Sequence, residues 1–156
     1  MPYALLSAVL IAADQLVKYL VRIRIPLGGH IGFLPGVMEL TYLQNTGAAF
    51  SIFREHTWAL TLLSLVATAA LAVVLLKKLW IKDPFGRVCL ALILAGAAGN
   101  LIDRALFGWV TDMFATLFVN FAVFNVADIC LTVGCVLMVV NVLLFSEKRE
   151  KKEKPQ

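Results

Sequence analysis

The class of fold is decided by the stretch FNVADICLTVGCVLMVVNVLLF, residues 124–145. Its last seventeen residues carry no charge and follow directly on Asp128. A helix of about 20 apolar residues crosses the hydrocarbon core of a bilayer, which is about 30 Å thick. A carboxylate at the mouth of such a helix is costly in hydrocarbon. We therefore expect a membrane span here and a function for Asp128.

Three more stretches have the length and composition of membrane spans. They cover residues 3–21, 58–76 and 86–106. The chain of 156 residues is 61% hydrophobic and only 15% charged, whereas soluble proteins are about 25% charged. These features predict an all-α polytopic membrane protein with four transmembrane helices, folded as one membrane-embedded domain over residues 1–156. The first stretch has no basic residue before it and contains Asp14 and Lys18, so we expect a retained span rather than a cleaved signal peptide.

Basic residues predict the orientation of the spans. Of the 14 lysines and arginines, four lie between the second span and the first residues of the third, Arg87 included, and five lie in the tail, residues 146–156. Cytoplasmic segments are enriched in lysine and arginine, so both termini are expected in the cytoplasm. The net charge of +4 is then explained by topology and lipid headgroups, and not by nucleic acid. The tail itself is expected to be disordered.

The two outer connections are predicted over residues 22–57 and 107–123. In the first, VMELTYLQ, residues 37–44, alternates apolar and polar side chains as a strand near the membrane surface would. The two histidines lack metal-ligand spacing, and the three cysteines all lie inside hydrophobic stretches. We therefore expect the cysteines to pack within the spans, and we predict no metal ion or cofactor.

Polar side chains interrupt the spans, and with the predicted orientation all of them fall toward the outer leaflet. They are Asp14 and Lys18 in the first span, Asn100, Asp103 and Arg104 in the third, and Asn125 and Asp128 in the fourth. Spacings of three and four residues place each set on one helical face. We predict a single polar site between the helices, just below the outer surface. For Asp14 with Lys18, and Asp103 with Arg104, mutual neutralisation in ion pairs is the alternative interpretation.

Asp112 and Asp128 have no basic residue within reach on their own segments. Two close carboxyl groups cannot both ionise easily, so one would serve as an acid and the other as a base. Such a pair can hydrolyse a peptide bond without a covalent intermediate. The chain has no G-x-S-x-G or H-E-x-x-H motif. An ion-coupled transporter and a non-catalytic assembly protein remain the alternative functions.

Five motifs stand in order along the chain. They are DQLVK at residues 14–18, NTGAAF at 45–50, GNLIDR at 99–104, VTDMF at 110–114 and FNVAD at 124–128. On these motifs the sequence resembles lipoprotein signal peptidase, also called signal peptidase II, a family of bacterial membrane aspartyl proteases. The resemblance covers residues 14–128, and the layout of four spans accounts for the rest.

The resemblance implies a role for each matching residue. Asp112 and Asp128 would be the catalytic pair, and Asp14 and Lys18 would be structural. The residues that would bind substrate or support the site are Asn45, Gly47, Asn100, Asp103, Arg104, Asn125 and Ala127. The interval of 16 residues between the two aspartates is short for the family, which leaves the shape of the second outer connection open.

The resemblance also implies an activity and a location. Members of the family cut a prolipoprotein just before a cysteine that carries a diacylglyceryl group, and they need no metal or cofactor. A small extracytoplasmic β-sheet cradle and a short surface helix would accompany the four spans. We expect a monomer in the bacterial cytoplasmic (inner) membrane, with its active site near the extracytoplasmic face. Its partners would be the prolipoprotein substrate and membrane lipids.

Overall fold

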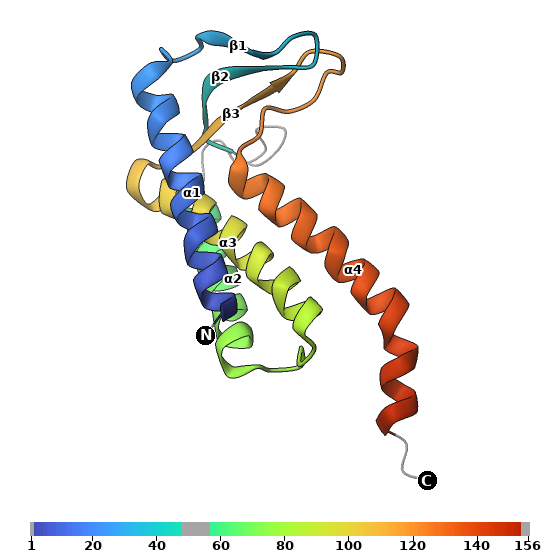
Figure 1. The fold of residues 1–156 in the computed structure, drawn as a ribbon. Helices are drawn as coiled ribbons and strands as arrows, with labels where there is room; N and C mark the ends of the chain where they lie inside the picture. Colours follow the sequence, from blue (N-terminus) through green and yellow to red (C-terminus); the bar gives the residue numbers. More distant parts are fainter. Residues whose placement is uncertain (1, 48–56, 154–156) are drawn as a thin grey trace.

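Four long helices and a small sheet make up the fold (Figure 1). The computed structural model describes the backbone of residues 2–47 and 57–153, with side chains up to residue 143. The elements in chain order are α1 (Pro2–Arg24), β1 (His30–Leu34), β2 (Met38–Asn45), α2 (Thr57–Lys77), α3 (Pro84–Phe107), β3 (Val110–Thr116) and α4 (Val126–Glu153). All four helices are long and apolar enough to cross a membrane. The predicted spans are therefore confirmed, to within a few residues at their ends.

Helix α3 is the centre of the bundle because it packs against α1, α2 and α4 (Figure 1). Small residues on α3 allow this close approach. Gly96 is buried, and a Cβ built there would meet the Ala127 carbonyl and the Leu131 side chain of α4. Helix α2 differs, since Leu75 is its one buried residue, with Leu71 and Val74 partly buried beside it, and most of its other side chains are at least partly exposed.

The sheet lies over one end of the bundle, which we call the sheet end (Figure 1). Its strand order is β1-β2-β3, and both pairs are antiparallel. The predicted strand at 37–44 is confirmed as β2, the central strand. Tyr42 of β2 and Met113 of β3 pack on Val21 and Ile25 at the end of α1. This small apolar core fixes the sheet on the helices.

The second outer connection contributes β3, which pairs with β2 so that Leu43 lies opposite Asp112 and Asn45 opposite Val110. The short interval between the two aspartates is therefore occupied by the rest of β3 and the loop over residues 117–125, which leads into α4. The short surface helix expected from the resemblance is not found in the described part of either outer connection. Residues 48–56, which include the end of the NTGAAF motif, lie outside the described residues.

The expectation of a disordered tail is wrong over residues 146–153, because α4 continues to Glu153. Lysine, arginine and glutamate are good helix formers. Extending an existing helix adds residues without the cost of nucleating a new one. Residues 146–153 of the basic tail therefore extend the helix of the last span.

Candidate active site

A glycine cap places Asp112 close to the bundle. Gly108 has φ 80° and its N–H donates to the Arg104 carbonyl at 3.0 Å, which ends α3 in a left-handed turn. Strand β3 begins two residues later, at Val110. Asp112 is thus a strand residue, only 1% exposed. The chain therefore leaves α3 and enters the sheet before it reaches Asp112.

Asp128 lies in the first turn of α4 and caps it together with Asn125. The Asp128 N–H donates to Asn125 Oδ1 at 2.9 Å, and the Asn125 N–H donates to Asp128 Oδ2 at 3.2 Å. This reciprocal pair is a capping box, which satisfies two N–H groups at the helix start. The positive end of the helix also favours negative charge at this position. Local structure thus offsets part of the cost of a carboxylate at the mouth of the span.

Three asparagine side chains hold the two carboxyl groups. Asp112 accepts from Asn125 Nδ2 on Oδ1 at 2.6 Å and from Asn45 Nδ2 on Oδ2 at 2.9 Å. Asp128 accepts from Asn100 Nδ2 on Oδ1 at 2.7 Å. Asn125 contacts both aspartates, so it links β3 to the start of α4. These bonds restrict both carboxyl groups to one geometry.

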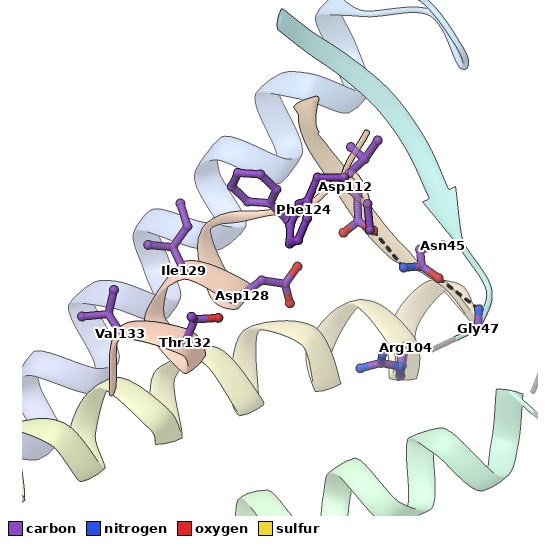
Figure 2. Close-up of a pocket in the computed structure, with 12 residues that line it drawn as sticks. Asn45, Gly47, Arg104, Asp112, Phe124, Asp128, Ile129, Thr132 and Val133 are labelled. Carbon is purple, nitrogen blue, oxygen red and sulfur yellow. Dashed lines mark hydrogen bonds between the residues drawn. The ribbon is translucent and has the colours of Figure 1, made fainter. Parts of the chain in front are cut away.

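Both carboxyl groups face one cavity of about 470 Å³ (Figure 2). Asp112 enters it from β3 and Asp128 from α4, while Arg104 of α3 approaches from another side. The cavity is lined by Asn45, Gly47, Arg104, Asp112, Phe121, Ala122, Val123, Phe124, Asp128, Ile129, Thr132 and Val133. Ile129 and Val133 belong to the exposed face of α4, so the cavity continues onto the surface that faces lipid.

Burial raises the pKa of Asp112 from its usual value near 3.8 to about 6. The neighbouring charge of Asp128 acts in the same direction. The hydrogen bonds from Asn45 and Asn125 and the charge of Lys18 oppose the rise, but burial is the larger effect. Asp112 can therefore hold a proton at a pH where an ordinary aspartate is ionised.

A buried ion-pair network lies behind the two aspartates. Lys18 Nζ is 2.9 Å from Asp14 Oδ2 and 3.8 Å from Asp103 Oδ2, and all three side chains are at most 1% exposed. The ion pair that was the alternative interpretation of Asp14 with Lys18 is therefore present. Asp14 Oδ1 also accepts from the Ala127 N–H at 2.8 Å, which ties the start of α4 to α1.

The alternative that Asp103 and Arg104 neutralise each other is wrong. Asp103 pairs with Lys18 and with Arg22 Nη1, the latter at 3.6 Å. Arg104 lines the cavity instead. The physical reason is that consecutive residues on a helix point in different directions. Asp103 therefore supports the site from behind, while Arg104 stands inside it.

Arg22 was missed by sequence reasoning. Its Nη1 donates to Thr111 Oγ1 at 3.0 Å, and its guanidinium lies 4.6 Å from the centre of the Phe107 ring. The Thr111 N–H donates to Asp103 Oδ2 at 2.8 Å. The residue next to Asp112 is thus held by α1 and α3 together. The spacing in the sequence could have identified Arg22, because it is four residues after Lys18 and shares its helical face.

The predicted site residues fall into two layers. Asn45, Gly47, Arg104, Asp112 and Asp128 line the cavity, and Asn100 and Asn125 hold its carboxyl groups. Asp14, Lys18, Asp103 and Ala127 form the layer behind. The wall residues Phe121 and Thr132 were not predicted, because they lie outside the five motifs, and Phe124 lies in the FNVAD motif but was not singled out. Among the described residues, no group of three His, Cys, Asp or Glu side chains could hold a metal ion.

Comparisons with known proteins agree over nearly the whole chain. The family model for signal peptidase (SPase) II matches residues 6–144. A lipoprotein signal peptidase of Streptococcus pneumoniae is 43% identical over 90% of this chain and 91% of the relative. One from Enterococcus faecalis is 40% identical over 97% and 93%, respectively. A solved bacterial membrane enzyme has a TM-score of 0.81 at 30% identity, over 99% of this chain and 94% of that one.

Proposed function

Since this chain belongs to the signal peptidase II family, it is an aspartic-type endopeptidase that removes signal peptides from prolipoproteins, and we propose that Asp112 and Asp128 are its catalytic pair. One observation carries the proposal. The two carboxyl groups enter the same cavity from β3 and α4, and asparagine amides hold both of them (Figure 2). A water molecule between them would contact a base and an acid at once.

Asp128 is the base in this proposal. Its two oxygens accept from the Asn100 side chain and the Asn125 N–H, and the start of α4 favours its negative charge. The attacking water gives a proton to Asp128 as its oxygen bonds to the scissile carbonyl carbon. When the tetrahedral intermediate collapses, this proton moves to the leaving nitrogen.

Asp112 is the acid. Burial raises its pKa to about 6, and a bound substrate would exclude water and favour the neutral form further. Asp112 donates its proton to the carbonyl oxygen as the water attacks, and it recovers the proton when the carbonyl re-forms. The pair therefore works with one shared proton, and no covalent intermediate is needed.

The cavity suits a lipid-modified peptide. Arg104 and Asn45 offer N–H donors to the carbonyl groups of an extended substrate, and Gly47 leaves room for its backbone. Ile129 and Val133 continue the cavity wall onto the lipid-facing surface of α4. The signal helix and the diacylglyceryl chains can then stay in the bilayer while the bond before the lipidated cysteine reaches the aspartates.

The orientation proposed for the chain puts the sheet end on the extracytoplasmic side of the bacterial cytoplasmic membrane. Basic residues between α2 and α3, and in the tail, support cytoplasmic placement of the opposite end. The exposed apolar side chains of the sheet and of the loop before α4, Phe33 and Phe118 among them, suit a location at the membrane surface. We propose that the enzyme acts as a monomer.

The test is cleavage of a diacylglyceryl-modified prolipoprotein by the purified protein in lipid. We expect the wild type to cut before the lipidated cysteine, and Asp112→Asn and Asp128→Asn to lose at least about 100-fold in rate, as loss of acid–base catalysis predicts. Asparagine keeps the shape of the side chain but cannot share the proton. Folded variants that cut at the normal rate would contradict the assignment. Proton or solute flux in proteoliposomes without cleavage would favour the transporter alternative.

A further inference from the structure

Lys18 is fully buried in α1 and does not line the cavity, yet it contacts the machinery behind it. Its ammonium is 2.9 Å from Asn100 Oδ1 and 3.4 Å from the Gly99 carbonyl, in addition to its ion pairs with Asp14 and Asp103. An ion pair with Asp14 alone would suffice to neutralise the charge. The bond to Asn100 therefore calls for a separate explanation.

The hydrogen-bonding chemistry of lysine determines how the Asn100 amide is oriented. An ammonium group has donors and no acceptor. The Asn100 atom that faces Lys18 must therefore be the oxygen, and the nitrogen must face Asp128, whose Oδ1 lies 2.7 Å away. Asn125 Nδ2 also donates to Asn100 Oδ1, at the longer distance of 3.2 Å. Two donors thus hold the amide in one orientation.

The orientation of Asn100 matters for the chemistry of Asp128. With the amide nitrogen toward it, Asp128 receives a donor, which favours its carboxylate form. A flipped amide would present an oxygen, which pairs well only with a protonated acid. The other charged groups near Asp128 are Asp112 of β3 and Arg104 of α3, which line the same cavity. Asp14 and Asp103 contact Lys18 directly.

We propose that Lys18 is a positioning residue for the peptidase reaction, which holds the Asn100 amide so that Asp128 works as the base. The proposal rests on the roles assigned above to Asp112 and Asp128. Lys18 acts through Asn100 and does not itself line the cavity. A merely structural lysine would support folding, and the effect of its removal on kcat would not depend on whether Asn100 is present.

The experiment removes the buried ion pair as a unit. Lys18→Met combined with Asp14→Asn leaves no unpaired charge from that pair, and Asp14→Asn alone is the reference. Ser7→Ala is the matched control, because Ser7 is also a buried polar residue of α1 and donates to the Ala91 carbonyl at 2.9 Å. Thermal melting follows folding, and kcat, KM and the pH profile are measured on a lipidated peptide in lipid.

Relative to Asp14→Asn, we expect the double variant to lose about tenfold in kcat with an unchanged KM, as loss of one charge-assisted hydrogen bond predicts. Because the charge of Lys18 also opposes the raised pKa of Asp112, its removal should move the basic limb of the pH–rate profile to higher pH. In an Asn100→Ala background, removal of Lys18 should cost no further kcat, because the positioned amide is already gone. Ser7→Ala should move neither limb.

Several results would overturn the proposal. They are an unchanged kcat and pH profile, a loss of kcat that adds to that of Asn100→Ala, or a double variant that does not fold while Asp14→Asn does. The last result would assign Lys18 to folding. If the Lys18 variant behaves as wild type while Asp128→Asn is inactive, the proposed function stands and only this inference fails. If Asp128→Asn itself cuts normally, the proposed function fails.

Discussion

Two aspartates cap transmembrane helices at opposite ends of the bundle, and their surroundings differ. Asp83 is the N-cap of α3, where it accepts from the Gly86 N–H at 2.6 Å and from Asn141 Nδ2 of α4 at 3.3 Å. Asp128 caps the first turn of α4 with Asn125. Only Asp128 lines the described cavity, where a second carboxyl group faces it. A carboxylate near a membrane span is therefore not in itself a sign of catalysis, because a helix cap explains it equally well.

Two buried asparagines differ in the same way, Asn125 just before α4 and Asn141 within it. Asn125 and Asn141 are 0% and 2% exposed, and each bonds to the capping aspartate at its own end. We expect Asn125→Ala to lose about 100-fold in kcat, because Asp112 and the cap of Asp128 lose their shared partner. Cleavage by the purified variants in lipid, with thermal melting, is the measurement.

Asn141→Ala is the matched control for this comparison. It should lower the melting temperature but leave kcat within about twofold, since each hydrogen bond that is lost costs about 1 kcal/mol of stability and none of the known partners of Asn141 lines the cavity. If both variants lost activity equally, the two ends of the bundle would not differ in the way described. If Asn125→Ala kept normal kcat, Asn125 would be a cap and nothing more.

Two glycines of α3, one at each end of the bundle, extend the comparison, and the losses expected from changing them are smaller. A Cβ at Gly86 would lie 2.7 Å from Asn141 Nδ2, and a Cβ at Gly99 would lie 2.6 Å from Asp14 Oδ2. We expect Gly86→Ala and Gly99→Ala each to destabilise the protein by about 1–3 kcal/mol, the usual cost of overpacking. Only Gly99→Ala should also lower kcat, by about tenfold, because Asp14 holds the start of α4 through Ala127.

Thermal melting and cleavage rates on the same preparations test this pair of glycines. A Gly99→Ala protein that is destabilised yet fully active would show that the start of α4 tolerates displacement. A Gly86→Ala protein that loses activity as strongly as Gly99→Ala would show that activity follows overall stability. Either result would contradict the distinction between a catalytic sheet end of the bundle and an opposite end whose polar residues are structural.

Much of the fold could be predicted because it depends on composition and on the spacing of apolar and polar residues within each segment. Span lengths followed from long, predominantly apolar stretches, and β2 followed from alternation in residues 37–44. The site could be predicted because polar residues are rare in membrane spans and their helical spacing places them on shared faces. These signals are contained within single segments of the chain.

The rest depends on which segments meet. The pairing of β3 with β2 requires the end of α1 as a platform for Met113. The partner of Asp103 could not be read from spacing, because Lys18 and Arg22 reach it from another helix while Arg104 turns into the cavity. The wall formed by the loop before α4 arises only when that loop returns to the sheet. Tertiary contacts, rather than local pattern, decide all three.

The pH dependence of kcat/KM for a lipidated peptide tests the central claim, that two aspartates share one proton, most directly. Asp112 must hold its proton to act as the acid, so activity should fall as pH rises through its raised pKa of about 6 in the free enzyme. Activity should also fall at low pH, as the base becomes protonated, which gives a bell-shaped profile. A profile that stays flat from about pH 5 to 8 would contradict a proton shared by these carboxyl groups.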